Sequence, residues 1–510
     1  MHRKISTIVI VGGGTAGWMT AVSLARMSAG LPYSIVLVES EEIGTVGVGE
    51  ATIPPISAFN AALHIDEQEF MRATQATFKL GIEFADWYRR GQSYMHPFGL
   101  FGVEMHGISF HHFWLRHRAQ GGKMQAGVFN VNMVASYSGR YGRIRADDNG
   151  PLPPTPYAFH FDAGLYAGYL RRLAEAAGVK RVEGRIVHVR QGGEDGFIES
   201  VKLDDGRVVP GDLFIDCSGF RGLLIEQTLH AGYEDWSRWL PCDRAMAVPC
   251  ERVAATTPYT RASAREAGWQ WRIPLQHRTG NGYVYCSQFL GDDEAAKQLL
   301  GRLDGAALAE PRPLRFLAGR RREIWKKNVV AIGLSSGFLE PLESTSIHLV
   351  QSAIARLLFL FPREGFDQAV IDKFNLLGNA ELEQIRDILV LHYTATERDD
   401  SPFWRHCRAI ERPESLLRRC EMYQRTGAIY SDAGDMFKVP SWFSIFEGQG
   451  LPAAGWHPFA DIPPDAELAR RFALVSGEVL KRVQTFPLHD DYIRAHCAAA
   501  QMNYLRAGAG

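Results

Sequence analysis

The first forty residues alternate between β-branched runs and a glycine-rich turn. Residues 5–11 are largely β-branched, which predicts a strand that is buried on both faces. A turn with several glycines follows, and residues 18–28 then carry small and apolar side chains at helical spacing. A second apolar run covers residues 33–39. The order of strand, glycine loop, helix and strand predicts a βαβ unit, which opens an α/β domain with a parallel sheet.

The remaining chain changes its periodicity several times. Residues 65–90 have helical spacing, and the helix predicted there carries Lys79. Residues 91–156 are rich in glycine, histidine and aromatic residues, which favours long loops. Further predicted elements are a helix over 161–178, an antiparallel sheet of 185–190, 196–203 and 208–214, strands within 242–290, a strand over 329–332, a helix over 346–360, and a mainly helical segment over 366–510 that is broken near 430–465.

Composition narrows the class of protein. The chain has 510 residues, of which 56 are Lys or Arg and 57 are Asp or Glu. This balance indicates neither a basic surface for nucleic acid nor a charged tail for a partner. The seven cysteines are scattered without metal-ligand spacing, which is typical of reduced thiols and predicts no metal site. No apolar run approaches the ~20 residues that span a bilayer, and the apolar start is too short for a signal peptide, so we expect a cytoplasmic protein.

The glycine loop has the spacing of a dinucleotide-binding turn. Gly12 permits the turn, Gly14 lets the backbone approach a pyrophosphate, and Gly17 allows close packing of helix and strand. The helix start then offers N–H groups to phosphate. Glu39 ends the second strand, where an acid binds a ribose hydroxyl. A purely structural glycine turn is the alternative.

Two later segments favour FAD over a nicotinamide cofactor. The strand that ends at Asp216, before Gly219, and the strand that ends at Gly333 resemble further FAD-contact segments of the glutathione-reductase and hydroxylase-like flavoproteins. The chain has no second complete glycine motif for NAD(P)H. We therefore expect an α/β fold: a Rossmann-like FAD-binding module of that type with an inserted β-sheet, and a largely helical module that covers the substrate.

The expected domain division follows from these segments. The FAD-binding module is expected over residues 1–365, with substrate-binding insertions at about 91–156 and 225–325. The helical module that covers the active site is expected over residues 366–510.

The string W-x-W-x-I-P, from Trp269 to Pro274, is the most informative one in the chain. Two tryptophans at alternate positions of a strand face the same way and form an aromatic wall. Pro274 closes the strand. A pair of ordinary core aromatics would have the same pattern.

Together with other motifs, this string resembles the flavin-dependent halogenases of the tryptophan-halogenase type. Besides the glycine loop, the matching motifs are Gly47-Val-Gly49-Glu-Ala-Thr-Ile-Pro54, Thr77-Phe-Lys79-Leu-Gly81, Tyr157-Ala-Phe-His-Phe-Asp162, W-x-W-x-I-P and Phe338-Leu-Glu-Pro-Leu-Glu343-Ser344. The resemblance covers residues 10–350 closely and the last third more loosely.

The resemblance implies an enzyme that uses FADH2, O2 and halide to make hypohalous acid, which halogenates an electron-rich aromatic ring. A separate reductase would supply the FADH2, and a homodimer is a further expectation. The implied FAD contacts are Gly12, Gly14, Thr15, Ala16, Gly17, Glu39, Ala51, Ile186, Asp216, Gly333 and Leu334. The implied lining of the tunnel that carries the hypohalous acid is Trp269, Trp271, Ile273, Pro274 and Ser344.

Two residues carry the chemistry that the resemblance implies. Lys79 would present the halogenating agent to the ring, as a hydrogen-bond donor or as a haloamine, and desolvation would favour both roles. Glu343 would orient the agent or accept the ring proton. A solvated surface lysine and a carboxylate at a capped helix start are the structural alternatives.

The resemblance also implies a halide site at Thr345 and Ser346, whose backbone amides open a helix. Well-known members have glycine in place of Ser346, so the choice between chloride and bromide stays open. The expected substrate pocket consists of His106, Phe110, His111, Trp442, Phe443 and Trp456. Its C-terminal side lacks the tyrosines that hold the backbone of free tryptophan, which favours indole or another small aromatic.

Two other functions remain as alternatives. A hydroxylating flavin monooxygenase would share the FAD fold but would need neither Lys79 nor W-x-W-x-I-P. A catalytically silent flavoprotein would bind FAD without a halide-dependent product. The histidines at 106, 111 and 112 are clustered, but no acid or cysteine completes a metal-binding set, so they fit ring contacts or loop packing better.

Overall fold

The computed structural model describes residues 4–43, 50–148, 150–432 and 434–500. The motif segment 47–49 lies outside these residues. The chain divides into two compact units that interleave along the sequence. Unit 1 consists of Met1–Ala76, Phe161–Arg238 and Arg315–Glu383, and unit 2 of Thr77–His160, Trp239–Leu314 and Gln384–Gly510. The predicted functional division at residue 365 stays a prediction.

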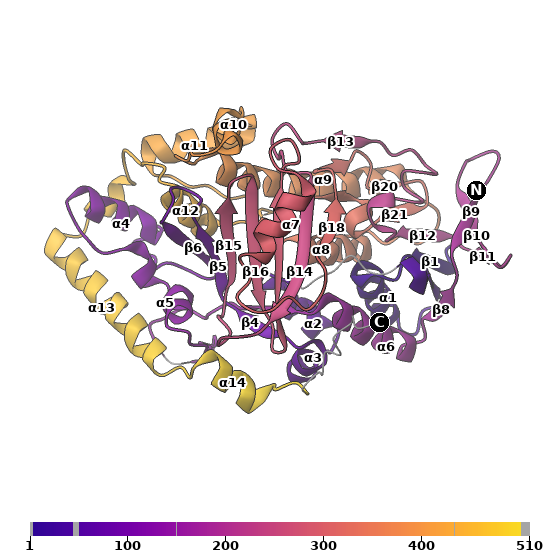
Figure 1. Ribbon diagram of the computed structural model, residues 1–510, viewed down its shortest axis with the longest axis horizontal. Helices are drawn as coiled ribbons and strands as arrows, with labels where there is room; N and C mark the ends of the chain where they lie inside the picture. Colours follow the sequence, from indigo (N-terminus) through magenta and orange to yellow (C-terminus); the bar gives the residue numbers. More distant parts are fainter. Residues whose placement is uncertain (1–3, 44–49, 149, 433, 501–510) are drawn as a thin grey trace. The chain divides into compact units, whose positions relative to one another are not determined.

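Unit 1 is built on a six-stranded, mostly parallel sheet (Figure 1). Its strand order is β20 (Trp325–Lys326), β21 (Val329–Ala331), β12 (Leu213–Asp216), β1 (Thr7–Val11), β2 (Ser34–Glu39) and β8 (Lys180–Glu183). Helix α1 (Thr15–Met27) follows β1 and packs against α6 (Ala163–Ala176) and α8 (Ser346–Phe359). The predicted βαβ opening is confirmed, and α1 begins three residues earlier than expected.

A small antiparallel sheet follows in unit 1. Its strands are β9 (Ile186–Gln191), β10 (Ile198–Leu203) and β11 (Val208–Pro210). The prediction of one strand over 208–214 was wrong, because β11 ends at Pro210 and β12 joins the parallel sheet. Asp212 lies between them, and its carboxylate accepts hydrogen bonds from the backbone N–H groups of Ser6 and Thr7 at 2.9 and 2.8 Å. These hydrogen bonds join the residue before β12 to the start of β1.

The other elements of unit 1 complete its body. A second three-stranded sheet contains β13 (Tyr233–Asp235), β19 (Gly319–Arg321) and β22 (Gly337–Phe338). The remaining elements are β3 (Glu50–Ala51), α2 (Pro55–Ala62), α3 (Glu67–Thr74) and the short 3-10 turns η1 (Glu41–Ile43), η3 (Gly219–Arg221), η4 (Gly333–Ser335) and η5 (Pro341–Glu343).

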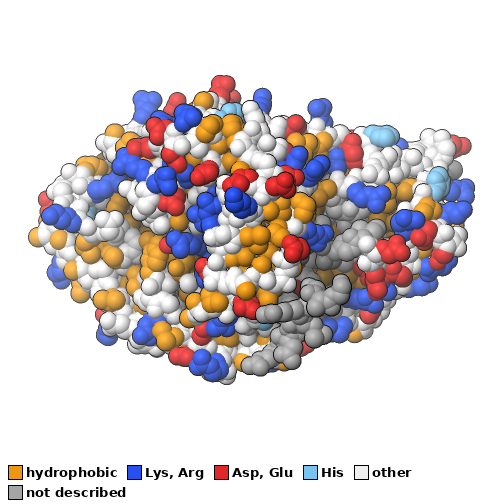
Figure 2. Space-filling view, viewed as in Figure 1, with side chains coloured by type: hydrophobic (Ala, Val, Ile, Leu, Met, Phe, Trp, Pro, Cys, Tyr) orange, Lys and Arg blue, Asp and Glu red, His pale blue; other side chains and the backbone are white. Residues whose placement is uncertain are grey.

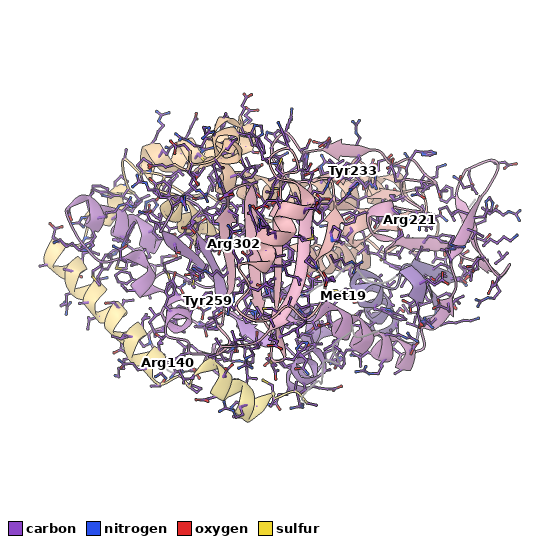
Figure 3. All side chains as sticks on the ribbon, viewed as in Figure 1. Met19, Arg140, Arg221, Tyr233, Tyr259 and Arg302 are labelled. Carbon is purple, nitrogen blue, oxygen red and sulfur yellow. The ribbon has the colours of Figure 1, made fainter. Side chains whose placement is uncertain are left out.

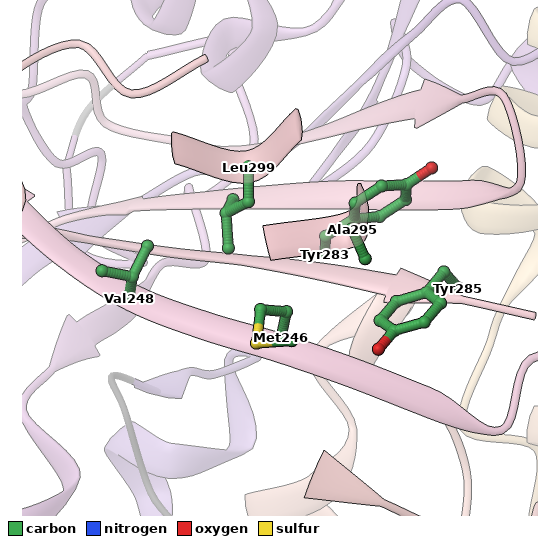
Figure 4. Close-up of a cluster of buried hydrophobic side chains, with 6 residues drawn as sticks. All are labelled: Met246, Val248, Tyr283, Tyr285, Ala295 and Leu299. Carbon is green, nitrogen blue, oxygen red and sulfur yellow. The ribbon is translucent and has the colours of Figure 1, made fainter. Parts of the chain in front are cut away.

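Unit 2 contains a seven-stranded sheet. Its order is β18 (Arg312–Arg315), β14 (Arg244–Glu251), β17 (Arg278–Tyr285), β16 (Gly268–Pro274), β15 (Thr260–Arg265), β5 (Gly81–Ala85) and β6 (Ser93–Pro97). Helix α7 (Asp292–Leu300) lies across β14 and β17. The core beneath it is shown in Figure 4 and consists of Met246, Val248, Tyr283, Tyr285, Ala295 and Leu299.

The predicted helix over residues 65–90 was wrong. Helix α3 ends at Thr74, since Gln75 adopts the left-handed conformation with φ 56°. The chain then forms β4 (Thr77–Lys79) and β5, and every residue of these strands is buried. Strand β4 pairs with β7 (Ala158–Phe161), with Lys79 opposite Ala158. A segment that is buried on all sides lacks the polar face of an amphipathic helix, so pairing partners decided its structure.

Helices make up most of the rest of unit 2. They are α4 (Phe110–Ala119), α5 (Val131–Tyr137), α10 (Pro402–Ala409), α11 (Glu414–Thr426), α12 (Val439–Gly448), α13 (Asp465–Gln484) and α14 (His489–His496), with 3-10 turns η2 (Ala126–Phe129) and η6 (Pro458–Asp461). The long helix α9 (Gln368–Thr394) belongs partly to each unit. Residues 91–156, predicted as loops, contain β6, α4 and α5, because their aromatic residues are packed in the core. The mainly helical C-terminal third is confirmed.

Basic and acidic side chains are interspersed over most of the face shown in Figure 2. No helix within the described ranges combines the length and the apolar character that crossing a membrane requires.

Candidate functional site

The glycine loop in unit 1 is packed as a dinucleotide-binding turn requires. Gly12 has φ +113°, and a Cβ there would lie 2.3 Å from the carbonyl oxygen of Cys217. A Cβ on Gly17 would lie 1.9 Å from the carbonyl oxygen of Gly12, whereas a Cβ on Gly14 would have no atom within 4 Å. Thr15 begins α1, and no side chain caps the helix start at Gly14. The loop therefore offers uncapped N–H groups beside an open approach, which fits a pyrophosphate.

Two other predicted cofactor segments meet this loop. The buried carboxylate of Asp216 accepts hydrogen bonds from the backbone N–H groups of Leu224 and Ile225, both at 2.8 Å, and thus shapes the turn after β12. A Cβ on Gly333, which has φ +80°, would lie 2.8 Å from the Cβ of Ala16. The three segments therefore come together at the carboxyl ends of parallel strands, where α/β proteins bind their ligands.

The remaining predicted cofactor residues are more dispersed. Glu39 ends β2, and its carboxylate accepts a hydrogen bond from Arg181 Nε at 2.6 Å. Leu334 lies in η4, Ala51 is buried in β3, and Ile186 begins β9. The roles of these residues at a flavin stay predictions.

The segment before α8 has the character of an anion site. Glu343 ends η5 and is 1% exposed, and Ser344 adopts the left-handed conformation with φ 59°. The Thr345 hydroxyl is buried, and within the described part of the chain it has no hydrogen-bond partner. No side chain caps α8, which begins at Ser346, so the capping interpretation of this segment is not supported. An uncapped helix start beside an unpartnered hydroxyl fits a halide.

Lys79 lies in unit 2 and is completely buried, which excludes the interpretation as a solvated surface lysine. It is the last residue of β4 rather than part of a helix. Its Nζ lies 5.4 Å from the ring centroid of Phe98. The pKa of the neighbouring His160 is held well below its ordinary value by burial and by the positive charge of Lys79.

The W-x-W-x-I-P strand is β16, in the same unit. The rings of Trp269 and Trp271 lie 6.1 Å apart, and both side chains are buried. Trp271 lies opposite Gly282 on β17, where a Cβ would come within 2.0 Å of its Cζ2 atom. Ile273 is buried as well, and the carbonyl oxygen of Pro274 accepts a 2.6 Å hydrogen bond from the hydroxyl of Thr77. The end of the motif is therefore tied to the strand of Lys79.

The predicted substrate residues do not form one cluster. The rings of His111 and Phe443 lie 5.5 Å apart and are in contact, and Trp114 packs on the same phenylalanine. Burial, followed by the neighbouring His112, lowers the pKa of His111 to about 3. His111 is thus a neutral ring that packs beside Phe443.

The other four predicted substrate residues have different neighbours. Phe110 packs on Phe129, and Trp442 packs on Phe446 with its indole N–H buried. The indole N–H of Trp456 donates to Asp461 at 2.8 Å, and His106 is exposed with φ 53°. Only His111 and Phe443 are therefore in direct ring contact among the six.

Sequence reasoning missed two histidines that contact the strand of Lys79, namely His160 and His489, and the role of the Thr77 hydroxyl within that strand. The only signal for His160 was its position in the Tyr157–Asp162 motif, and His489 had none. In the described residues, no three His, Cys, Asp or Glu side chains are arranged to hold a metal ion.

Comparisons with known proteins identify the family of the chain. The tryptophan halogenase family model matches residues 7–465. Tryptophan 7-halogenase RebH from Lentzea aerocolonigenes is 38% identical, with 97% of this chain and 99% of that protein covered. Tryptophan 6-halogenase SttH from Streptomyces toxytricini is 35% identical, with coverage of 97% and 98%.

Solved structures give the same result. Xcc4156, a flavin-dependent halogenase from Xanthomonas campestris, superposes with a TM-score of 0.95 at 46% identity, and 98% of this chain and 100% of that one are covered. BrvH, a flavin-dependent halogenase from Brevundimonas sp. BAL3, has a TM-score of 0.94 at 45% identity, with coverage of 97% and 100%. The chain therefore belongs to the tryptophan halogenase family and is a flavin-dependent halogenase.

Proposed function

We propose that this enzyme halogenates indole or an indole derivative rather than free tryptophan. Bound FADH2, delivered by a separate flavin reductase, would supply the reducing equivalents that convert O2 and halide to hypohalous acid. The glycine loop, Asp216 and Gly333 would hold the FAD, and the amides of Thr345 and Ser346 the halide. The uncapped starts of α1 and α8 support these assignments.

The complete burial of Lys79 is the observation that carries the proposed halogenation reaction. An ammonium group loses several kcal/mol of hydration when it is buried, so a lysine in such a place needs a compensating role. A neutral amine at this position would be nucleophilic. In the proposed reaction, Lys79 presents the halogenating agent to the ring as a donor or as a haloamine.

Glu343 supplies the second proposed role. Its buried carboxylate would orient the agent or accept the proton that the ring loses after halogen addition. Trp269, Trp271, Ile273, Pro274 and Ser344 would line the path of the hypohalous acid to the substrate. The tight packing of Trp271 against Gly282 supports a fixed wall on that path.

The preference for indole rests on the C-terminal side of the proposed pocket. Trp442 and Phe443 offer an indole N–H and a hydrocarbon ring, and neither neutralises an amino-acid carboxylate. The relatives RebH and SttH carry tryptophan in their names, so free tryptophan is the competitor that a test has to include. A homodimer also stays a prediction, which light scattering of the purified protein tests.

The first experiment compares wild type with Lys79→Ala and Lys79→Arg enzymes. Each is incubated with FAD, a flavin reductase, NADH, O2 and chloride or bromide, and mass spectrometry follows indole and tryptophan. We expect halogenated indole from wild type and at least a ~100-fold loss in both variants, since arginine is charged but a poor nucleophile.

Other products would overturn the proposal. Hydroxylated indole would indicate a monooxygenase, and peroxide without any halide-dependent product would indicate a silent flavoprotein. Preferential halogenation of free tryptophan would retain the reaction but refute the proposed substrate.

A further inference from the structure

Strand β4 has three residues, and β7 binds only one of its edges. At the other edge, the backbone N–H of Phe78 donates to Nε2 of His489 at 3.1 Å. His489 is 1% exposed and begins α14, so this bond joins residues 411 positions apart in the sequence. A buried backbone N–H without a partner would destabilise the strand, and His489 removes that penalty.

This bond determines the protonation state of His489. A backbone N–H can only donate, so Nε2 accepts and the ring proton is on Nδ1. Nδ1 lies 3.0 Å from the carbonyl oxygen of Thr256, which can only accept. A protonated imidazolium would carry a hydrogen on Nε2 as well and would oppose the N–H of Phe78. The contact therefore requires a neutral ring with its proton on Nδ1.

His160 is in the same state on the other side of the strand. The Thr77 hydroxyl donates its only hydrogen to the carbonyl oxygen of Pro274 at 2.6 Å. Its oxygen therefore accepts from Nδ1–H of His160 at 3.0 Å. Nε2 of His160 is left as the acceptor for the hydroxyl of Thr260 at 2.9 Å. His160 is also fully buried.

We propose that His160 and His489 are positioning residues that clamp β4 as neutral Nδ1–H tautomers and thereby hold Lys79 in its reactive place. The clamp rests on the proposed function, in which Lys79 presents the halogenating agent. It joins β4 to the end of the W-x-W-x-I-P strand through Thr77, and to α14 through His489.

Further contacts hold α14 in register. Figure 3 labels Arg140 where α13 meets α14, and Arg140 is bridged to Leu488 there. The backbone N–H of His489 donates to the carbonyl oxygen of Gly139 at 2.9 Å. The rings of Phe78 and Tyr141 stack with centroids 3.9 Å apart. The clamp is therefore connected to several other segments of unit 2.

Burial favours the neutral state of both histidines. Burial lowers the pKa of His489 to about 4; the Thr256 carbonyl and Asp490 act in the opposite direction, and Arg252 adds to the lowering. Asp490 is itself paired with Arg252 at 2.6 Å. His160 faces Lys79 and His489, and both add to the effect of burial on its pKa. A clamp of this kind opens only under acidic conditions.

The activity test separates positioning from folding. In His489→Leu enzyme we expect halogenated product to fall on the order of 10- to 100-fold, because a reacting group displaced by about 1 Å loses that much rate. Hypohalous acid trapped by a β-diketone scavenger should rise as product falls, since the flavin and halide residues of unit 1 are intact. His489→Gln should stay within about threefold of wild type, because its amide oxygen accepts the Phe78 N–H. His496→Gln, an exposed histidine on the same helix, serves as the control.

A second variant and a spectroscopic measurement keep the test independent of folding and of activity. Thr77→Val should also lower the halogenated product and raise the trapped hypohalous acid, whereas Thr77→Ser should not. ¹⁵N NMR of the histidine rings should show two neutral Nδ1–H tautomers down to about pH 5, and His489→Gln should remove one of them.

The outcomes distinguish the two proposals. A wild-type enzyme that forms neither product nor hypohalous acid refutes the proposed function, while the NMR tautomers still test the clamp. If product and trapped hypohalous acid fall in parallel in His489→Leu, or Nε2–H tautomers are found, the positioning role is wrong.

Discussion

At the residue scale, the polar side chains that we propose to take part in the reaction are buried in both units. Lys79 and Thr345 are 0% exposed and Glu343 is 1% exposed. Such groups are rarely buried unless they have partners or functions. Their burial is the property that sequence spacing could not reveal.

Thr345 gives the first prediction at this scale. Thr345→Val removes a buried hydroxyl that has no hydrogen-bond partner among the described residues, so thermal unfolding should show about 1 kcal/mol of added stability. If halide binds there, the same change should raise the KM for halide about three- to tenfold, through the loss of one hydrogen bond to an anion.

A matched variant tests the assignment of Thr345. The hydroxyl of Ser136, in unit 2, is also buried without a hydrogen-bond partner in the described chain. Ser136→Ala should give a similar gain in stability with no change in the KM for halide. An unchanged KM in Thr345→Val would exclude its hydroxyl from the halide site.

Gly282 gives the second prediction. Its Cβ would lie 2.0 Å from Cζ2 of Trp271, so Gly282→Ala has to displace the indole. We expect a loss of about 1–3 kcal/mol in the free energy of unfolding, as in other overpacked cores. Product analysis should also show more escaped hypohalous acid per halogenated ring. Trp271→Phe in the Gly282→Ala background should recover part of the stability; no recovery would place the strain elsewhere.

At the element scale, strand β4 shows where local patterns fail. The spacing of apolar residues over 65–90 favours a helix, yet the chain changes to strands after Gln75. Strand β7 pairs with one edge of β4, and His489 binds the backbone N–H of Phe78 at the other edge. These partners are distant in sequence, so no local window contains the information.

Helix α8 begins at the proposed halide site, and its contacts with α9 support a prediction about the stability of the folded protein. Glu381 of α9 contacts three successive turns of α8, accepting from Ser352 at 2.8 Å and from Arg356 at 2.6 Å and pairing with His348 at 3.1 Å. Glu381→Ala should cost about 3 kcal/mol in denaturant unfolding, because it leaves the guanidinium of Arg356, whose side chain is 11% exposed, without its carboxylate. Glu467→Ala, in a more exposed pair with Arg471, should cost no more than about 0.5 kcal/mol.

The same carboxyl has a defined pH dependence. Burial raises its pKa, but the contacts with His348, Arg356 and Ser352 outweigh burial and lower it below the ordinary 4.5. A lowered carboxyl pKa stabilises the folded state above pH 4.5, and this stability is lost as the pH falls through the folded value. Glu381→Gln should therefore flatten that part of the stability profile; an unchanged profile would contradict the stabilising contacts of Glu381 with α8.

At the scale of the whole molecule, the α/β fold class is confirmed, and so is the family. The proposed flavin and halide residues, with Glu343, belong to unit 1. Lys79, the W-x-W-x-I-P strand and the aromatic candidates belong to unit 2. Each unit is assembled from three chain segments, so the division by chemistry does not follow the order of the sequence.

Acid should destabilise unit 2 through its buried histidines. His160 and His489 have pKa values lowered by burial, the latter to about 4, so the unfolded chain binds protons more readily below pH 6.5. Each should remove about 1.4 kcal/mol of stability per pH unit below that value, and the loss for His489 should end near pH 4. Hydrogen exchange at pH 5 and pH 7.5 should show earlier loss of protection in β4, β7 and α14. Uniform loss across both units would contradict this cause.

The sequence by itself determined the βαβ opening, the glycine loop and two strands of the small antiparallel sheet, while the family followed from the resemblance of its motifs. These features depend on side-chain periodicity and on residue types at short, fixed spacing, which a single chain displays directly. Only the tertiary structure decided that Lys79 lies on a buried strand, that β12 leaves the hairpin for the parallel sheet, and that His489 meets Phe78. Such contacts depend on which distant segments satisfy each other's hydrogen bonds and exclude water, and no local pattern encodes that choice.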